Sequence, residues 1–177
     1  DSMDIQLWVV QTLNGLQLGV MLFLMSAGLT LVFGIMNLIN LAHGSLYMLG
    51  AYLAATFQAV TGSFFLACLL AVPVVMGIGI LIEISILRRL YDREHLDQVL
   101  ATFALILFFN ELVRIFWGSQ AYFMAIPEPL SGTFEILPGI PYPAYRLAIL
   151  LAGLGVATGL YLFIGRTRLG MIIRAGS

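Results

Sequence analysis

Charged residues are scarce in this sequence. Only 10% of its 177 residues are charged, all eight basic residues are arginine, and 61% are hydrophobic. Soluble domains carry about 25% charged and about 45–50% apolar residues. A mean hydropathy of +1.02 therefore indicates an integral membrane protein. A water-soluble fold is excluded, the lipid bilayer is an expected partner, and no nucleic-acid partner is expected.

Motifs for catalysis and nucleotide binding are also missing. The sequence has no GxxxxGK[ST] phosphate loop, no HExxH, no GxSxG and no CxxC. His43, His95 and the single Cys68 lie far apart, and one cysteine forms no disulfide within the chain. We therefore expect no catalytic residue, no metal site and no cofactor, and a protein that is not an enzyme. A membrane enzyme with His43 as its base is the alternative, but the sequence offers no carboxylate close by.

Long apolar runs dominate what is present. Crossing a bilayer takes about 20 helical residues. We expect four crossings and one shorter apolar helix, in chain order, at 5–35, 45–60, 64–87, 99–117 and 147–165. The predicted fold class is an all-α integral membrane protein with about five transmembrane helices, one of them broken or re-entrant near residues 36–44. Residues 1–177 are expected to form a single transmembrane domain.

The stretch at 28–52, GLTLVFGIMNLINLAHGSLYMLGAY, is apolar at both ends and polar in the middle. Asn37, Asn40 and His43 stand at i, i+3 and i+6, so on a helix they would share one face. Such side chains are costly in lipid unless they find partners. The stretch therefore either lines a pathway or turns around at the membrane surface.

Small residues and charge pairs mark the helices. Two GxxxG pairs, Gly15 with Gly19 and Gly155 with Gly159, permit close approach of another helix. Chance pairing is the alternative, because glycine is frequent in membrane helices. Near helix ends, Glu83 is expected to reach toward Arg88 or the interface, and Glu111 to pair with Arg114 three residues later.

Two connections flank the third crossing. Residues 88–98, RRLYDREHLDQ, are predicted to be a charged surface loop, with His95 solvated. The proline-rich segment 118–145 is predicted to be the longest non-helical connection. A loop of that kind either contacts a partner or is a passive connector.

Arginine placement predicts orientation. The 88–98 loop and the C-terminal tail are separated by two crossings, so they lie on the same side and together hold six of the eight arginines. Cytoplasmic loops are enriched in Lys and Arg. The predicted topology thus has the 88–98 loop and the C-terminus in the cytoplasm and the 118–145 loop outside.

The sequence resembles a known family at several places. The segment at 28–52, and NLAHG within it above all, resembles the N-terminal signature of permease subunits of bacterial branched-chain amino acid ABC transporters. NGLQLG at 14–19, ILRRLYDR at 86–93 and TRLGMIIRA at 167–175 extend the resemblance over nearly the whole chain. Chains of that family continue with further helices, so the resemblance implies an N-terminal fragment.

The resemblance implies a function and partners. The protein would be a multi-pass permease subunit in the bacterial inner membrane that carries branched-chain amino acids. Its partners would be a second permease subunit, cytoplasmic ATP-binding subunits that hydrolyse the ATP, and a periplasmic or extracellular substrate-binding protein. The alternatives are a permease for urea or short-chain amides and a non-transporting membrane scaffold.

Two site hypotheses follow. In the first, a half-helix that starts near Gly44 directs its positive N-terminal end into the membrane, where it favours a substrate carboxylate. The candidate pathway residues are Asn37, Asn40, His43, Gly44, Ser45, Tyr47 and Gly50. The alternative is a cytoplasmic turn that meets only lipid headgroups.

In the second hypothesis, a coupling segment begins near residue 166 and docks on the ATP-binding subunit. Its candidate residues are Arg166, Arg168, Gly170 and Arg174. The alternative is that the arginines only set topology and bind anionic headgroups.

Overall fold

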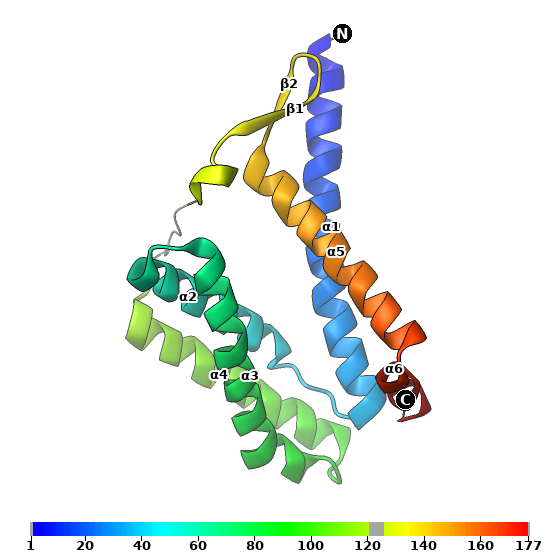
Figure 1. Cartoon of the computed structure of the whole chain (residues 1–177). Coiled ribbons are helices and arrows are strands. Elements are labelled where there is room, and N and C mark those ends of the chain that lie inside the picture. Colours follow the sequence, from blue (N-terminus) through cyan, green and yellow to red (C-terminus); the bar gives the residue numbers. More distant parts are fainter. Residues whose placement is uncertain (1, 121–125, 177) are drawn as a thin grey trace. The chain divides into compact units, whose positions relative to one another are not determined.

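The computed structural model describes residues 2–120 and 126–176, which form helices joined by turns and one β-hairpin (Figure 1). In chain order the elements are α1 Ser2–Met36, α2 His43–Thr61, α3 Phe64–Ser85, the 3₁₀ helix η1 Leu87–Leu90, α4 His95–Trp117, the 3₁₀ helix η2 Glu128–Leu130, β1 Thr133–Leu137, β2 Ile140–Pro143, α5 Ala144–Arg166 and α6 Arg168–Gly176. The predicted helical membrane fold is confirmed.

Among the described residues, four helices, α1, α3, α4 and α5, are long and apolar enough to cross a membrane. α2 has 19 residues but is less apolar, so the predicted number of about five agrees if α2 is included. At 1.5 Å per residue the 35 residues of α1 extend about 50 Å, well beyond a hydrocarbon core of about 30 Å. α1 must therefore tilt or reach out of the core, as its long apolar run predicts.

Local chemistry explains how α2 gives way to α3. Gly62 has φ +73° and donates its N–H to the Gln58 carbonyl at 2.8 Å, which closes α2. A left-handed conformation is easy only for glycine at such a helix end. Ser63 then caps α3, because its hydroxyl accepts from the Leu66 N–H at 3.4 Å. A turn at 61–63 thus separates the two apolar runs predicted at 45–60 and 64–87.

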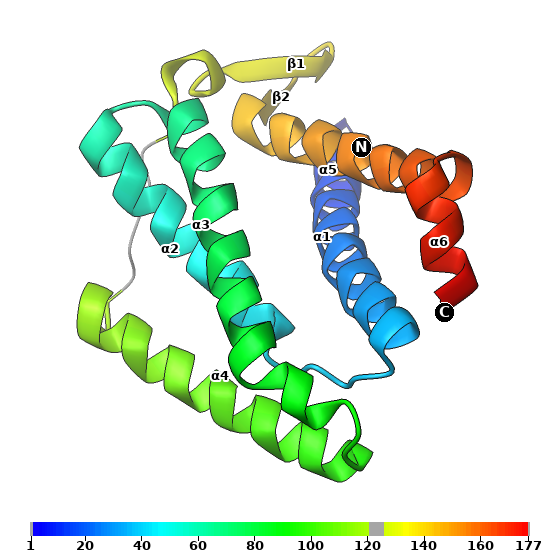
Figure 2. The ribbon, with the colours of Figure 1, turned by 60° about the horizontal axis from the view of Figure 1, so that its bottom comes forward.

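The chain divides into two compact units. The first comprises Asp1–Thr30 and Ile126–Ser177, and in it α5 approaches α1 while α6 turns away from the end of α5 (Figure 2). The second comprises Leu31–Ala125, in which α2 packs along α3 and also contacts α4. A side chain at Gly153 would overlap Val20, so glycine permits the close crossing of α1 and α5.

The charged connection is shorter than predicted. η1 occupies part of residues 88–98, and α4 begins at His95. The prediction of a surface loop is therefore wrong for its last four residues, and Gln98 is only 1% exposed. His95 remains exposed and meets the Phe33 ring edge-on, with ring centroids 6.2 Å apart.

The connection at 118–145 contains structure that the sequence reading missed; residues 121–125 of it lie outside the described residues. β1 and β2 pair antiparallel, with Phe134 opposite Tyr142. Pro138 and Gly139 form the turn, where Gly139 has φ +84° and proline presets its own φ. The sequence predicted a non-helical connection, into which the hairpin fits, but it did not predict the strands. The prolines stand at the turn and along a two-stranded edge, where proline is tolerated.

Candidate functional site

The polar break between α1 and α2 comprises residues 37–42. α1 ends where Asn37 adopts φ +50° and donates its N–H to the Phe33 carbonyl at 2.8 Å. Asparagine is among the few residues that tolerate this conformation. The apolar run therefore ends at Asn37, a residue that readily adopts the left-handed conformation found at helix ends.

Asn40 organises the start of α2. Its Oδ1 accepts from the Ala42 N–H at 3.0 Å, and the side chain is only 6% exposed. The Asn40 carbonyl accepts from the His43 N–H at 3.4 Å. The side-chain bond forms an Asx turn just before the helix, whose N-cap residue, Ala42, makes no side-chain cap. α2 begins at His43, one residue from the position expected for the half-helix.

The predicted pathway residues lie close together in the chain but not on one helix face. Residues 37–42 are non-helical, so Asn37, Asn40 and His43 do not share the face that their spacing suggested. That expectation fails because Asn37 ends α1. Of the candidates, Asn40 and Ser45 are buried, His43 and Gly50 are half-buried, and Asn37, Gly44 and Tyr47 are exposed.

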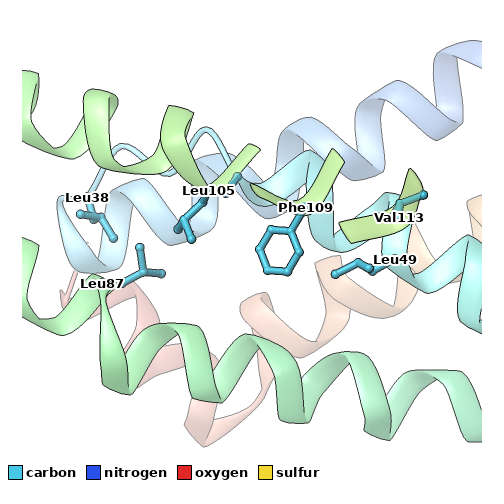
Figure 3. Packing of buried hydrophobic residues seen from close by; sticks show 7 residues of the cluster. Leu38, Leu49, Leu87, Leu105, Phe109 and Val113 are labelled. Carbon is cyan, nitrogen blue, oxygen red and sulfur yellow. The ribbon is translucent and has the colours of Figure 1, made fainter. Parts of the chain in front are cut away.

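An apolar cluster packs against the break. Leu38 is completely buried and belongs to a cluster whose buried members come from the break, α2, η1 and α4, with partly buried residues of α3 packed against it. Its buried members are Leu38, Ala42, Leu49, Leu87, Leu105, Phe109 and Val113 (Figure 3). The break is thus fixed by apolar packing as well as by its own hydrogen bonds.

Gln98 makes contacts that were not predicted from the sequence. Its Oε1 accepts from the Ile39 N–H at 3.1 Å, and its Nε2 donates to the Leu90 carbonyl at 3.0 Å and the Arg93 carbonyl at 3.5 Å. The only sequence signal was an amide close to an apolar run, and Gln98 was assigned to the loop. The partner, Ile39, is 59 residues away.

The end of α3 carries the expected ion pair and a further hydrogen bond to the same carboxylate. Arg88 lies 3.3 Å from Glu83, and the Tyr91 hydroxyl donates to the other carboxylate oxygen at 2.7 Å. Burial, together with the hydrogen bond to Glu83, raises the pKa of Tyr91 to about 12. The second predicted pair is also present, with Arg114 and Glu111 3.0 Å apart and both exposed. Exposed pairs of this kind contribute little stability.

The coupling candidates lie around a sharp elbow between α5 and α6. The Thr167 hydroxyl donates to the Phe163 carbonyl and accepts from the Gly170 N–H at 3.0 Å, so it caps α6. Gly170 is buried, and a Cβ there would overlap the Phe163 and Ile164 carbonyls. Arg166, Arg168 and Arg174 are exposed around this elbow. The segment expected to begin near residue 166 forms the short helix α6.

The β-hairpin is held to α1 by polar contacts. Asn14 Oδ1 accepts from the Tyr142 hydroxyl at 2.8 Å and from Arg146 Nη1 at 2.9 Å. Nearer the N-terminus, Gln6 donates to the Gly139 carbonyl at 3.1 Å. Tyr142 is 1% exposed, so this bond satisfies a buried hydroxyl and fixes where the hairpin sits on α1.

Neither glycine pair makes the close contact that Gly153 makes with Val20. Gly15 and Gly19 line a shallow apolar groove with Leu154 and Ala157 of α5. No atom lies within 4 Å of a Cβ built at Gly155 or Gly159. Their role in packing against another helix stays a prediction. Within residues 2–120 and 126–176, no group of three His, Cys, Asp or Glu side chains is placed to hold a metal ion.

Comparison with known proteins identifies the family. The family model described as "Branched-chain amino acid transport system / permease component" matches residues 11–176. The chain belongs to this family. It is 30% identical over 185 residues to the high-affinity branched-chain amino acid transport system permease protein BraD of Pseudomonas aeruginosa, covering 97% of this chain and 60% of that protein.

A second relative is the permease protein LivH of the corresponding high-affinity system of Escherichia coli, which is 26% identical over 179 residues, covering 93% of this chain and 57% of that protein. The chain thus spans about 60% of the length of these relatives. No solved structure matches the chain significantly. With the apolar helices, the family membership makes this a multi-pass membrane protein.

Proposed function

We propose that the protein is a permease subunit of an ABC importer that moves branched-chain amino acids across the bacterial inner membrane. The family match over residues 11–176 carries the proposal. Both relatives are bacterial proteins named as permeases of high-affinity branched-chain amino acid transport systems. Separate subunits would bind and hydrolyse ATP, in keeping with the lack of a phosphate-binding loop in this sequence.

The proposal includes partners and an orientation. A second permease subunit would complete the pathway, and a substrate-binding protein would deliver amino acids from outside. The 88–98 segment and the C-terminal segment from Arg166 onward would face the cytoplasm, because together they hold six of the eight arginines. The hairpin segment would then face the outside.

The break at 37–42 is the proposed substrate path. The positive end of the α2 helix dipole, at His43, favours a substrate carboxylate. Asn40 uses its Oδ1 to bind the Ala42 N–H, so its NH₂ group is the part that would donate to substrate. Because Asn40 is buried, the break has to open before substrate reaches it.

Leucine uptake by the complete transporter tests the proposal. Cells that lack their own leucine importers should take up leucine only when permease and ATP-binding subunits are both present. Isoleucine and valine should compete, while urea and acetamide should not. Competition by urea, or ATP hydrolysis that no amino acid stimulates, would replace the proposal with an amide permease or a scaffold, respectively.

The coupling surface is proposed to be α6 with the end of α5. An Arg174→Glu variant should insert normally but lose substrate-stimulated ATP hydrolysis, because a charge reversal in an interface opposes docking. Arg114→Glu, a reversal at an exposed arginine of α4, is the matched control. Full stimulation in Arg174→Glu would contradict the coupling role.

A further inference from the structure

A single side-chain amide joins two segments that are distant in sequence. Gln98 in α4 accepts from the Ile39 N–H in the break and donates to the Leu90 and Arg93 carbonyls in the connection between α3 and α4. The side chain is 1% exposed. Its Oε1 therefore binds a donor and its Nε2 binds acceptors at a position that solvent does not reach.

The chemistry of this contact requires an amide. At one point the Ile39 N–H meets an acceptor and the Leu90 and Arg93 carbonyls meet a donor; the Leu90 carbonyl also accepts from the Arg93 N–H at 3.1 Å. Glutamine carries both at the end of one side chain. A hydrocarbon chain of equal length would leave these backbone groups without this partner, and buried unsatisfied groups are costly.

Neighbouring contacts hold Gln98 in place without replacing it. Thr102 is fully buried and donates to the Gln98 carbonyl at 2.7 Å, which fixes the backbone of α4 there. Leu38 of the break and Leu87 of η1 belong to the same buried cluster (Figure 3). Apolar packing thus brings the break and the connection together, and the amide sets how one is oriented against the other.

We propose that Gln98 is a positioning residue that fixes the break at 37–42 to the connection at 86–93, so that a displacement of this connection moves the break. The consequence for transport rests on the proposed function, in which the break lines the substrate path and the connection faces the cytoplasm. The mechanical claim itself concerns only the second unit and is measurable without transport.

A Gln98→Glu variant of the complete protein tests this claim by pH. In its neutral form the new carboxyl group accepts from Ile39 and donates to Leu90, so it preserves the contact. In its ionised form it donates nothing and places a charge beside two carbonyls. Burial raises the pKa of such a carboxyl above its usual value of about 4.3. The contact should therefore hold at low pH and be lost as pH rises through the raised pKa.

The readout is thiol labelling at Leu41→Cys, an exposed position of the break, in a Cys68→Ser background. Labelling should be measured from about pH 5 to about pH 9, the range in which buried carboxyl groups titrate. For Gln98→Glu, the labelling rate relative to the parent should rise about tenfold with pH, as expected for one lost buried hydrogen bond. Gln98→Met, which lacks both hydrogen-bonding groups, should label fast at every pH.

Two controls isolate the effect. Gln11→Glu adds the same carboxyl group at an exposed glutamine of α1 and should leave labelling at the break unchanged. The parental protein contains the same Tyr91 and His95, and the exposed Arg93, Glu94 and Asp97 near residue 98. Its pH profile therefore subtracts their titration and that of the thiol.

Each outcome decides the claim. A pH-dependent rise in Gln98→Glu, together with fast labelling in Gln98→Met, supports the positioning role. Labelling equal to the parent in both variants overturns it. If labelling changes as expected but leucine uptake does not, Gln98 still positions the break and the proposal that the break lines the substrate path fails.

Discussion

The chain interrupts its apolar helices in two contrasting ways. At the elbow between α5 and α6, Thr167 and Gly170 bind groups three or four residues away. At the break between α1 and α2, the local contact of Asn40 is joined by Gln98, which lies 59 residues from Ile39. The elbow is therefore built from its own sequence, whereas the break depends on the packing of the whole second unit.

The contrast suggests different mechanical roles. An elbow with local contacts keeps its angle while its surroundings move, which suits a rigid docking element. A break held by remote partners changes when those partners shift, which suits an element that must open. Interfaces and packed cores tend to switch between discrete arrangements rather than deform continuously.

Substituting Gly170 should give the largest effect. In Gly170→Ala the new methyl group overlaps the Phe163 and Ile164 carbonyls, so α6 has to leave its position at a cost of about 2 kcal/mol. Trypsin cleavage at Arg174 should accelerate, and substrate-stimulated ATP hydrolysis should fall. Gly165→Ala, where no atom lies within 4 Å of the new carbon, is the control. Equal cleavage of the two variants would count against a rigid elbow.

Two side-chain bonds beside helix starts should separate local from remote dependence. Asn40→Ala removes the bond of the turn that precedes α2, and Thr167→Val removes the cap of α6. Each bond is worth about 1 kcal/mol. Asn40→Ala should lower the thermal stability of the protein in detergent and reduce leucine uptake. Thr167→Val should loosen α6 while leaving the melting temperature unchanged. Asn110→Ala, at an exposed asparagine of α4, is the control for the first variant. If both variants lowered the melting temperature equally, the distinction between local and remote dependence would be contradicted.

A second remote contact offers a smaller effect. Trp117 donates to the Thr56 hydroxyl at 2.7 Å across 61 residues. Thr56→Val should destabilise the second unit by about 1 kcal/mol, the value of a typical buried hydrogen bond, and change Trp117 fluorescence in a Trp8→Phe background. Thr61→Val removes only local bonds, to the Phe57 carbonyl and to the backbone of Ser63, and should leave the fluorescence unchanged.

Tyr91 should show the smallest effect, confined to high pH. Its pKa is raised to about 12, first by burial and then by the bond to Glu83. The neutral phenol is therefore the favoured form in the fold, and its contribution to stability is present below about pH 10 and lost as pH rises toward 12. When the tyrosines of the protein in detergent are titrated by absorbance, Tyr91→Phe should remove the component that titrates at the highest pH. If that component remained in Tyr91→Phe, Tyr91 would be exposed to solvent.

Much of this architecture was predictable because hydropathy and local chemistry decide it. The crossings, the turn at Gly62, the Glu83–Arg88 pair and the amphipathic tail all follow from neighbouring residues. The position of the break was also predicted, since Asn37 and Asn40 are misplaced in an apolar run.

The rest depends on contacts that a single sequence does not display. Gln98 resembled one more polar residue of a charged loop, because nothing nearby indicates that its partner is Ile39. The hairpin was missed because prolines predict irregular structure and its anchor, Asn14, stands 128 residues from Tyr142. The shared face of Asn37 and His43 was wrong because periodicity assumes a helix, and Asn37 ends one.

The most direct test of the account is thiol labelling at His43→Cys and Leu41→Cys in the complete transporter with Cys68→Ser. Membrane-impermeant reagents would be applied from each side, with and without ATP and leucine. We predict that labelling changes between the nucleotide-free and ATP-bound states and that leucine slows it, because the break opens onto the substrate path. Labelling only from the cytoplasm, at one rate in every state, would contradict the account and make residues 37–42 a turn at the membrane surface.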